Sequence, residues 1–477
     1  MIHRYRLNRY NIVLDVASGS VHSTDEAAYE AIGIIDELCK GDADTAASEL
    51  SRDDFRTKLL ERMRKLLPEY PEEELYEVLS DIRELIGAGK LFAKDVYRDL
   101  AFDLKKRSPV VKALCLLVSH SCNLSCDYCF AAQGRFKGKS GLMSFETGRR
   151  ALDFLVENSG TRKNLEVDFF GGEPLLNFEV IKRLVEYARS IEKDAGKNFR
   201  FTLTTNGIGL NDEVMEWANR ECYNVVLSLD GRREVNDRFR VDQSGQGSYD
   251  RIVPKFQEFV RRRGGKGYYI RGTFTRHNTD FTRDIFHMAD DLGFTELSME
   301  PVVCAPSDEN ALREEDLPVL KEQYEILAKD MIRRRRDGRP ITFYHYMIDL
   351  EEGPCIYKRI SGCGSGTEYL AVTAWGELYP CHQFVNDPLY KMGDIWEGIT
   401  DTGLQDRFKL CNVYSKPDCD NCFARLYCAG GCPANALHAA GDIHGTYEYG
   451  CELFRKRIEC ALMLKVDELC HTDLKTK

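Results

Sequence analysis

The sequence predicts an α/β protein organised around a partial (β/α)6 barrel, with a small α+β unit before it and a cysteine-rich region after it. Three observations lead to this prediction. Short apolar runs alternate with amphipathic helical segments between about residues 110 and 300, as expected for parallel strands covered on both faces. Polar–glycine steps follow three of these runs and a cysteine motif follows a fourth, and eleven of the 18 cysteines lie between Cys355 and Cys470.

Composition sets the broad class of the protein. The chain has 477 residues, 43% of them hydrophobic and 30% charged, which is typical of a soluble globular protein. Its net charge of −11 argues against nucleic-acid binding, since phosphate contacts need basic residues. No apolar run approaches a membrane span, and the N-terminus lacks a signal peptide. We therefore expect a cytoplasmic protein without a membrane partner, whose cysteines bind metal or do chemistry.

Residues 1–105 form the α+β unit. Apolar residues alternate from Tyr10 to Val16, as in a half-buried strand. Thr24 or Asp25 is expected to cap a helix that ends near Cys39, and two further helical patterns follow. Gly87 and Gly89 are expected to open a final hairpin, which would make the unit winged-helix-like.

The barrel is expected in residues 106–310. A helical stripe runs from Ile181 to Ile191, and Asn211 and Asp280 are expected to cap later helices. Functional residues of such barrels lie at the carboxyl ends of the strands. The expected strands are 114–118, 167–170, 201–205, 225–229, 269–274 and 296–299.

A helical bridge, residues 311–350, and a cysteine-rich region, residues 351–477, complete the chain. The bridge helix ends in four arginines, 333–336, which we expect to complement the helix dipole and to be solvated. The final region is rich in glycine and poor in long periodic segments, as expected where metal ligation replaces a large core.

The first chemical motif follows the first barrel strand. Cys122, Cys126 and Cys129 can bring three thiolates to one centre. Three ligands on a 4Fe-4S cluster leave one iron open to a small molecule, whereas the same thiols as a zinc site would lack a ligand. The second strand ends in Gly171-Gly172-Glu173-Pro174, where a carboxylate could hold an ammonium group. The third and fourth strands end in Thr204-Thr205-Asn206-Gly207 and Ser228-Leu229-Asp230-Gly231.

These motifs together resemble the radical S-adenosylmethionine enzymes, over residues 110–300. The resemblance implies that Cys122, Cys126 and Cys129 bind a 4Fe-4S cluster whose open iron chelates S-adenosylmethionine. It further implies that the remaining cofactor contacts come from the strand ends and from Arg240. Arg240 could instead be an ordinary surface arginine. Tyr128 would pack by the adenine, Gly172, Glu173 and Pro174 would meet the methionine amino group, Ser228 would reach the ribose or carboxylate, and Arg240 would pair with the carboxylate.

The C-terminal cysteines resemble the SPASM extension of radical S-adenosylmethionine peptide maturases, which holds two auxiliary 4Fe-4S clusters, three clusters in all. The Cys-x2-Cys spacing, taken alone, would favour a zinc site. The resemblance implies that three cysteines bind the inner cluster. Its fourth iron would either stay open for a substrate thiolate or bind a fourth cysteine. Cys355 is the candidate for that cysteine, and Cys411 is less well placed. The outer cluster would take Cys419, Cys422, Cys428 and Cys451, and the inner one Cys363, Cys381 and Cys432.

The order of the regions is similar to that of maturases that form Cys thioether crosslinks, the SCIFF-peptide maturases in particular. The resemblance implies that a 5′-deoxyadenosyl radical abstracts a hydrogen atom from a Cys-rich precursor peptide. The N-terminal unit would bind the leader of that peptide as an added strand, and an external low-potential donor would supply electrons in an anaerobic organism. Sulfatase maturases carry a catalytic Asp after the second inner-cluster cysteine, where this chain has His382. His382 could act as a base or have a structural role.

Other functions remain open on the sequence. Another SPASM maturase could form formylglycine or a carbon–carbon crosslink. A zinc-stabilised protein could instead use the N-terminal unit as a dimerisation, peptide-binding or DNA-binding module. Product mass distinguishes the maturases, and bound zinc without turnover of S-adenosylmethionine would indicate the binding protein.

Overall fold

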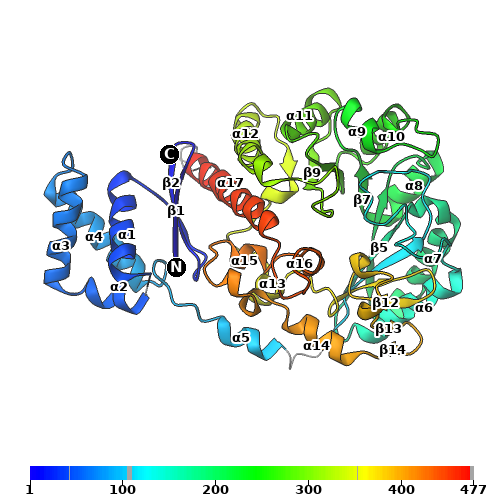
Figure 1. Cartoon of the computed structure of the whole chain (residues 1–477), viewed down its shortest axis with the longest axis horizontal. Coiled ribbons are helices and arrows are strands. Elements are labelled where there is room, and N and C mark those ends of the chain that lie inside the picture. The colour runs from blue at the N-terminus through cyan, green and yellow to red at the C-terminus, as the bar shows by residue number, and fades with distance from the viewer. Residues whose placement is uncertain (42, 105–109, 352, 473–477) are drawn as a thin grey trace.

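The computed structural model describes residues 1–41, 43–104, 110–351 and 353–472. The expected boundary between residues 105 and 106 therefore lies outside the described residues. Within them, three structural regions follow one another along the chain. The N-terminal helices are at the left of Figure 1, the barrel is at the right, and the cysteine-rich turns lie between and below them.

The N-terminal unit combines a small antiparallel sheet with helices. Its strands are β1 (Ile2–Leu7), β2 (Tyr10–Asp15) and β3 (Val21–Thr24), in the order β1-β2-β3. Asp25 caps the first helix, because its carboxylate accepts a hydrogen bond from the backbone N–H of Ala28 at 2.8 Å. The helices are α1 (Glu26–Cys39), α2 (Ala43–Glu49), α3 (Asp53–Leu66), α4 (Glu72–Gly87) and α5 (Arg98–Asp103).

The expected hairpin after Gly87 is wrong, since residues 88–97 contain no strand. Gly89, with φ +67°, ends helix α4 instead, and the N–H of Lys90 bonds to the carbonyl of Leu85 at 2.9 Å, as in a helix C-cap. Leu91 and Phe92 are then buried among the helices. Two apolar residues in succession anchor this segment against the helices, and the unit has no wing at this place.

The barrel prediction is confirmed: six parallel strands pair in chain order, each near its expected position. Helices between them cover the sheet (Figure 1), and Asn211 caps one by accepting from the N–H of Val214 at 2.9 Å. The strands are β4 (Ala113–Ser119), β5 (Asn164–Gly171), β6 (Asn198–Thr205), β7 (Cys222–Ser228), β8 (Tyr268–Phe274) and β9 (Glu296–Pro301). The helices are α6 (Phe145–Asn158), α7 (Phe178–Ala195), α8 (Asp212–Glu221), α9 (Arg233–Phe239), α10 (Tyr249–Arg262) and α11 (Phe281–Phe286).

The sheet continues beyond the barrel on both sides, which the sequence did not predict. The cysteine-rich region adds a parallel strand beside β4 and then three short antiparallel strands. This continuity places the start of that region against the barrel. The added strands are β10 (Thr342–Phe343) beside β9, and β11 (Tyr369–Val372), β12 (Glu377–Tyr379), β13 (Gly393–Asp394) and β14 (Gly398–Ile399).

Two long helices join the three regions. Helix α12 (Leu317–Arg336) packs against α17 (Glu448–Thr472), and α17 lies between α12 and the N-terminal sheet in Figure 1. The hydroxyl of Tyr5 donates to the carbonyl of Glu459 on α17 at 2.8 Å. The remaining helices are α13 (Ile356–Ser361), α14 (Thr402–Leu410), α15 (Arg425–Cys428) and α16 (Pro433–Ala440).

The arginines that end α12 are not simply solvated, contrary to expectation. Arg334 is buried and pairs with Asp290 at 2.6 Å and with Asp330. Arg336 donates to Asp467 of α17 at 2.8 Å. The run is an ion-pair cluster that ties α12 to its neighbours, because carboxylates from two other elements reach it.

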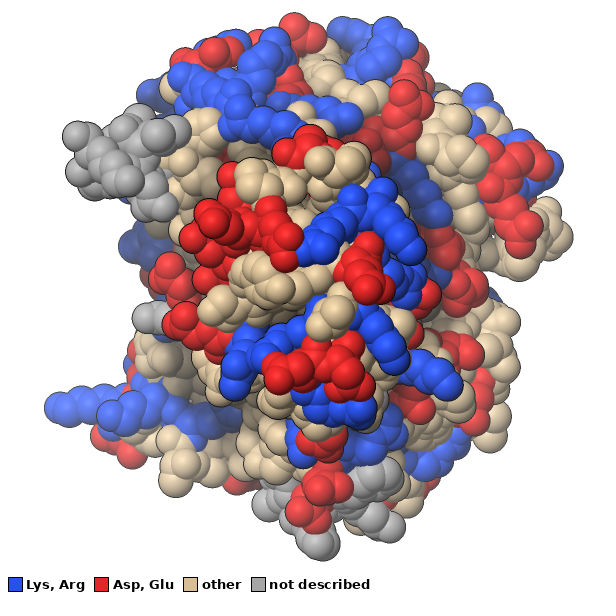
Figure 2. All heavy atoms as spheres, turned by 90° about the vertical axis from the view of Figure 1, so that its left-hand side faces the viewer, with Lys and Arg blue, Asp and Glu red and all other residues tan. Residues whose placement is uncertain are grey.

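The surface of the N-terminal side carries both signs of charge. Figure 2 shows Lys and Arg side chains interspersed with Asp and Glu over that face. Such mixing gives no broad electrostatic field of one sign.

Among the described residues, no helix is long and apolar enough to span a membrane.

Candidate active site at the barrel mouth

The first cysteine group opens into a cavity of about 380 Å³ at the carboxyl ends of the barrel strands. Cys122, Cys126 and Cys129 lie on the loop after β4 and all line this cavity. Burial raises the pKa of Cys122 to about 12, and it raises that of Cys126 to about 11 although the charge of Arg240 opposes the rise. Such thiols become thiolates only when a metal replaces the proton, so this donor set fits a metal centre.

Glycines bring the cysteine loop against the next strand end. A Cβ on Gly172 would lie 2.3 Å from the carbonyl oxygen of Ser121 and 2.9 Å from the Cα of Gly134. The N–H of Gly172 donates to the carbonyl of Ser119 at 2.8 Å. The glycine therefore permits the chain's own backbone to approach, and this packing fixes the cysteine loop beside Glu173.

Glu173 is a buried carboxylate, 1% exposed, on the cavity wall. It accepts hydrogen bonds from the hydroxyl of Thr205 at 2.7 Å and from the backbone N–H groups of Asn206 at 2.8 Å and Leu175 at 3.1 Å. Burial raises its pKa to about 7, although these hydrogen bonds oppose the rise. A cation in the cavity would stabilise the carboxylate, so Glu173 fits the amino group of a cofactor.

Asp230 organises the wall formed by the fourth strand end. It is fully buried and accepts from the hydroxyl of Tyr128 at 2.6 Å and from the backbone N–H of Thr273 at 2.9 Å. Arg240 forms an ion pair with it at 3.0 Å and lines the cavity beside Ser228. Arg240 is therefore no ordinary surface arginine, and Asp230 fixes both Tyr128 and Arg240.

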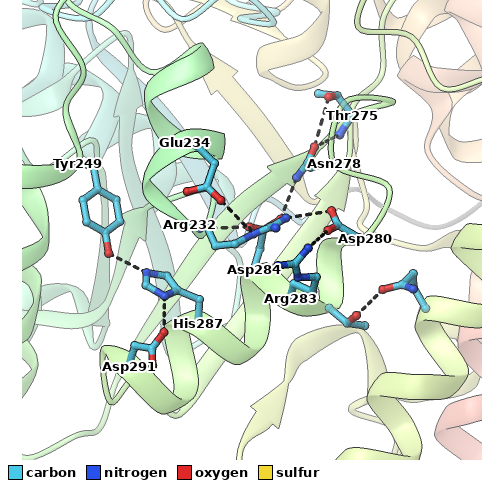
Figure 3. Close-up of polar contacts among 12 residues, drawn as sticks. Arg232, Glu234, Tyr249, Thr275, Asn278, Asp280, Arg283, Asp284, His287 and Asp291 are labelled. Carbon is cyan, nitrogen blue, oxygen red and sulfur yellow. Dashed lines mark hydrogen bonds and ion pairs between the residues drawn. The ribbon is translucent and has the colours of Figure 1, made fainter.

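A second set of polar contacts stabilises the turn after β7 (Figure 3). Gly231 has φ +113°, and a Cβ there would lie 2.3 Å from the Cβ of Asp284. Asp284 is fully buried and accepts from the backbone N–H of Arg232 at 3.1 Å and from its Nε at 2.7 Å. Asn278 donates to the same carboxylate at 3.2 Å, and Asp280 pairs with Arg232 instead of capping α11. These contacts fix the position of the strand end.

The neighbouring strands β8 and β9 bring two charged side chains to the cavity that no sequence motif indicates, Arg271 and Glu300. His345 lies 3.5 Å from Glu300, and Arg457 donates to the Nδ1 of His345 at 2.9 Å. Burial alone would raise the pKa of Glu300, but His345, Arg271 and Arg457 together lower it. Burial lowers the pKa of His345 to about 4, so at neutral pH the two arginines keep Glu300 ionised.

The cavity also reaches the C-terminal cysteines, since Cys432, His382 and Gln383 line it. The His382 ring lies 4.9 Å from the ring of Phe170 and 5.4 Å from that of Phe130, centroid to centroid. Burial lowers the pKa of His382 to about 4. His382 is therefore a neutral imidazole packed between aromatic rings at neutral pH.

Within each of the inner and outer sets that the resemblance implies, some of the C-terminal thiols interact electrostatically. In the inner set, the charges of Cys432 and Cys363 add to burial in raising the pKa of Cys381. Cys411, the less favoured of the two candidate fourth ligands, is buried and interacts with Cys363 and Cys432. Cys355 is exposed.

In the outer set, burial and then the charges of Cys451 and Cys422 raise the pKa of Cys428 to about 12. Cys419 interacts with Cys428 and Cys422 in the same way. Among the described residues, no group of three or more His, Cys, Asp or Glu side chains could hold a single metal ion. Ligands of a 4Fe-4S cluster bind different irons and need not meet at one point.

Comparisons with known proteins agree with this geometry. Residues 116–280 match the model of the radical SAM superfamily. The chain is 23% identical over 350 residues to the cysteine-type anaerobic sulfatase-maturating enzyme of Clostridium novyi, covering 68% of this chain and 89% of that protein. It is 33% identical over 138 residues to an uncharacterized protein of Methanocaldococcus jannaschii, but spans only 45% of that relative's length.

Two solved structures share the fold. The structure of native anSMEcpe with bound AdoMet and Kp18Cys peptide has a TM-score of 0.62 at 20% identity, covering 76% of this chain and 99% of that one. Streptococcus suis SuiB bound to S-adenosylmethionine has a TM-score of 0.51 at 18% identity, covering 91% of this chain and 95% of that one. Residues 116–280 thus form a radical SAM domain, in a chain homologous over most of its length to the anaerobic sulfatase-maturating enzymes.

Proposed function

We propose that the protein is a radical S-adenosylmethionine maturase that installs Cys thioether crosslinks in a ribosomally made, Cys-rich precursor peptide. One observation carries the proposal: a single cavity is lined both by the first cysteine group and by Cys432 of the inner group. A radical made at one end and a thiolate held at the other would meet in that cavity. Peptide substrates are also named for relatives, since solved neighbours hold a Kp18Cys peptide and the SuiA precursor.

The residues of the barrel mouth would hold the cofactors in defined places. Cys122, Cys126 and Cys129 would bind the first 4Fe-4S cluster. When bound, this cluster and S-adenosylmethionine supply a 5′-deoxyadenosyl radical that removes a hydrogen atom from the peptide. Glu173 would bind the methionine amino group, with Gly172 and Pro174 beside it.

The same cavity wall offers contacts for the rest of S-adenosylmethionine. Ser228 would reach its ribose or carboxylate, and Tyr128 would pack by its adenine. Arg240 would pair with its carboxylate while Asp230 holds the guanidinium in place, at 3.0 Å. Because Asp230 also accepts from Tyr128 at 2.6 Å, one buried carboxylate would orient two cofactor contacts.

The far end of the cavity would serve the substrate cysteine. Cys363, Cys381 and Cys432 would bind the inner cluster and leave one iron for the substrate thiolate, since iron–sulfur sites favour soft ligands. Cys419, Cys422, Cys428 and Cys451 would bind the outer cluster. Thioether formation removes one hydrogen atom, one proton and one electron from the peptide. The carboxylate of Glu300, which lines the same cavity, would accept the proton, and the auxiliary clusters would take the electron.

The N-terminal unit would bind the leader of the precursor. β3 pairs with β2 on one side, and its other edge would take the added peptide strand, whose backbone hydrogen bonds would supply much of the affinity. His3 and Tyr5 of β1 contact Glu459 of α17 at 3.1 and 2.8 Å, which leaves β3 as the edge for the peptide. An external low-potential donor would reduce the first cluster.

Product mass tests the proposal against other maturases. The purified, reconstituted chain is incubated without oxygen with S-adenosylmethionine, dithionite and short Cys-rich peptides encoded in the same genome. A loss of two hydrogen atoms per crosslink, with one fewer free thiol for each, supports thioether formation. Loss of two hydrogen atoms with all thiols retained would indicate a carbon–carbon crosslink, and a product with an aldehyde would indicate formylglycine.

A further inference from the structure

An arginine without an ion-pair partner faces the cavity at the barrel mouth. Arg271 lies on β8, on the face of the strand opposite to its buried neighbours Ile270 and Gly272. Its side chain is exposed and lines the cavity. Among the described residues, no carboxylate forms an ion pair with this guanidinium. Arg240, the other arginine on the cavity wall, by contrast pairs with Asp230 at 3.0 Å.

Strand pairing places Arg271 between two other cavity residues. On one side it lies opposite Ser228 of β7, and on the other side it lies opposite Ser298 of β9. Two residues further along the same pair of strands, Thr273 lies opposite Glu300. Ser228, Thr273 and Glu300 all line the cavity. Arg271 is therefore on the stretch of wall where the proposed cofactor contact Ser228 and the proposed proton acceptor Glu300 adjoin.

The charges on this stretch of wall do not balance. Glu300 has His345 at 3.5 Å, and Arg457 of α17 donates to the Nδ1 of His345 at 2.9 Å. His345 is neutral at neutral pH, because burial lowers its pKa to about 4. Among the described residues, no carboxylate forms an ion pair with Arg457 either. Two guanidinium groups therefore share one carboxylate, and one positive charge is left uncompensated.

Water can solvate this extra charge only while the cavity is empty. Arg271 is exposed, so water reaches its guanidinium from the cavity. A ligand that fills the cavity displaces that water, and a charge that loses its water without gaining a partner costs free energy. A ligand that brings one negative charge to Arg271 removes this cost.

We propose that Arg271 binds a side-chain carboxylate of the substrate peptide, so that the enzyme selects precursors with an Asp or Glu in the segment that enters the cavity. The inference rests on the proposed function in one respect, namely that a peptide fills the cavity. A carboxylate matches the planar guanidinium with two parallel hydrogen bonds. It also supplies the one negative charge that this stretch of wall lacks, which a side-chain amide or a backbone carbonyl does not.

The carboxylate of S-adenosylmethionine is the competing anion. Under the proposed function it pairs with Arg240, which lines the cavity beside Ser228. If Arg271 held this carboxylate instead, loss of Arg271 would weaken the binding of S-adenosylmethionine. If Arg271 binds the peptide, the affinity for S-adenosylmethionine stays the same and only the response to peptides changes. The two assignments therefore predict different measurements.

The test compares Cys-rich peptides encoded in the same genome with versions whose Cys-containing segment has Asn and Gln in place of every Asp and Glu. The readout is 5′-deoxyadenosine that the reconstituted full-length protein forms above its peptide-free background, which requires no thioether. The wild type should lose roughly 30-fold in kcat/KM on the amide peptides, as expected when a hydrogen bond to a charged group is lost. Arg271→Gln should treat both peptide sets alike, within about threefold.

Three further measurements serve as controls. Arg276→Gln is the matched variant, because Arg276 pairs with Glu315 at 3.4 Å and lies outside the cavity, and it should keep the preference for acidic peptides. Arg271→Glu should prefer peptides with Lys in place of Asp by about tenfold, since the charges are then exchanged. Calorimetric titration should give the same affinity for S-adenosylmethionine in Arg271→Gln as in the wild type.

Other outcomes would overturn the inference. Equal turnover of acidic and amide peptides by the wild type would do so, even if the variants fail to fold. A preference that persists in Arg271→Gln, or weaker binding of S-adenosylmethionine in that variant, would also overturn it. A wild-type protein that no peptide stimulates would overturn both proposals. A preference that Arg271→Gln removes, in a protein whose product keeps all its thiols, would refute only the proposed thioether formation.

Discussion

The structure organises the barrel cysteines and the C-terminal cysteines by different means. The first group lies on a loop at the end of β4, inside a parallel sheet whose strand ends supply Glu173 and Asp230. Cysteines of the outer set lie on short turns, such as the 3-10 turn at Pro417–Cys419 and α15 at Arg425–Cys428. A sheet preorganises the first site, whereas we expect the second region to depend on metal ligation for its order.

Cysteine substitutions should separate the two neighbourhoods most sharply. Cys126→Ser should abolish cleavage of S-adenosylmethionine while leaving the fold intact, because the barrel core does not depend on that thiol. Cys432→Ser should leave cleavage measurable but abolish the crosslinked peptide. Chromatography of 5′-deoxyadenosine and mass spectrometry of the peptide measure the two activities, and equal loss of both in Cys432→Ser would contradict the division of roles.

Glu300→Gln should lower crosslinking about 100-fold, the usual effect of losing a proton acceptor. Cleavage of S-adenosylmethionine should persist, since the first cysteine group lies elsewhere on the cavity wall. Glu296→Gln is the matched control, because Glu296 lies on the same strand outside the cavity and accepts from Thr342 at 3.2 Å. A parallel loss of cleavage in Glu300→Gln would indicate a structural role instead.

Cys428→Ser should make the C-terminal region at least about tenfold more sensitive to protease, because local opening governs cleavage there. The barrel should resist digestion as before. Limited proteolysis with mass mapping compares this variant with Cys460→Ser, whose thiol is buried in α17 outside both cysteine sets. Equal sensitivity of the two variants would show that ligation does not order the region.

The affinity for S-adenosylmethionine should fall as pH decreases below about 7. Burial raises the pKa of Glu173 to that value, so the empty site takes up a proton over a pH range in which an ordinary carboxyl group stays ionised. The cofactor's ammonium group needs the carboxylate, and each pH unit below 7 should weaken binding by up to about tenfold. Calorimetric titration from pH 5.5 to 8 measures the slope, which Glu173→Gln should remove.

The barrel could be predicted from the sequence because its strands are long and continuously apolar. Its six strands and the Asn211 cap are found where the apolar runs and the N-cap signal placed them. Strands β11 to β14 were missed, since two to four residues carry little periodicity. The predicted wing was wrong because Gly89 ends a helix, and Leu91 is buried against the helices instead of pairing as a strand.

The candidate site could be predicted where its residues form local motifs and not where it depends on pairing across the fold. Cys122 and Glu173 were found through their spacing and the strand ends. Asp230 belongs to the fourth strand-end motif, but the motif does not indicate its role, because its partners Tyr128 and Arg240 come from other segments. Glu300 gave no sequence signal at all, because only the folded chain brings it to the cavity.

Iron, acid-labile sulfide and zinc per chain, measured after anaerobic reconstitution, test the central claim most directly. The account predicts roughly twelve irons and as many sulfides in the wild type, for three 4Fe-4S clusters. It predicts about four of each when Cys363, Cys381, Cys419 and Cys428 are all replaced by Ala, because the first cluster alone remains. About four irons in the wild type, with zinc in the C-terminal region, would contradict it.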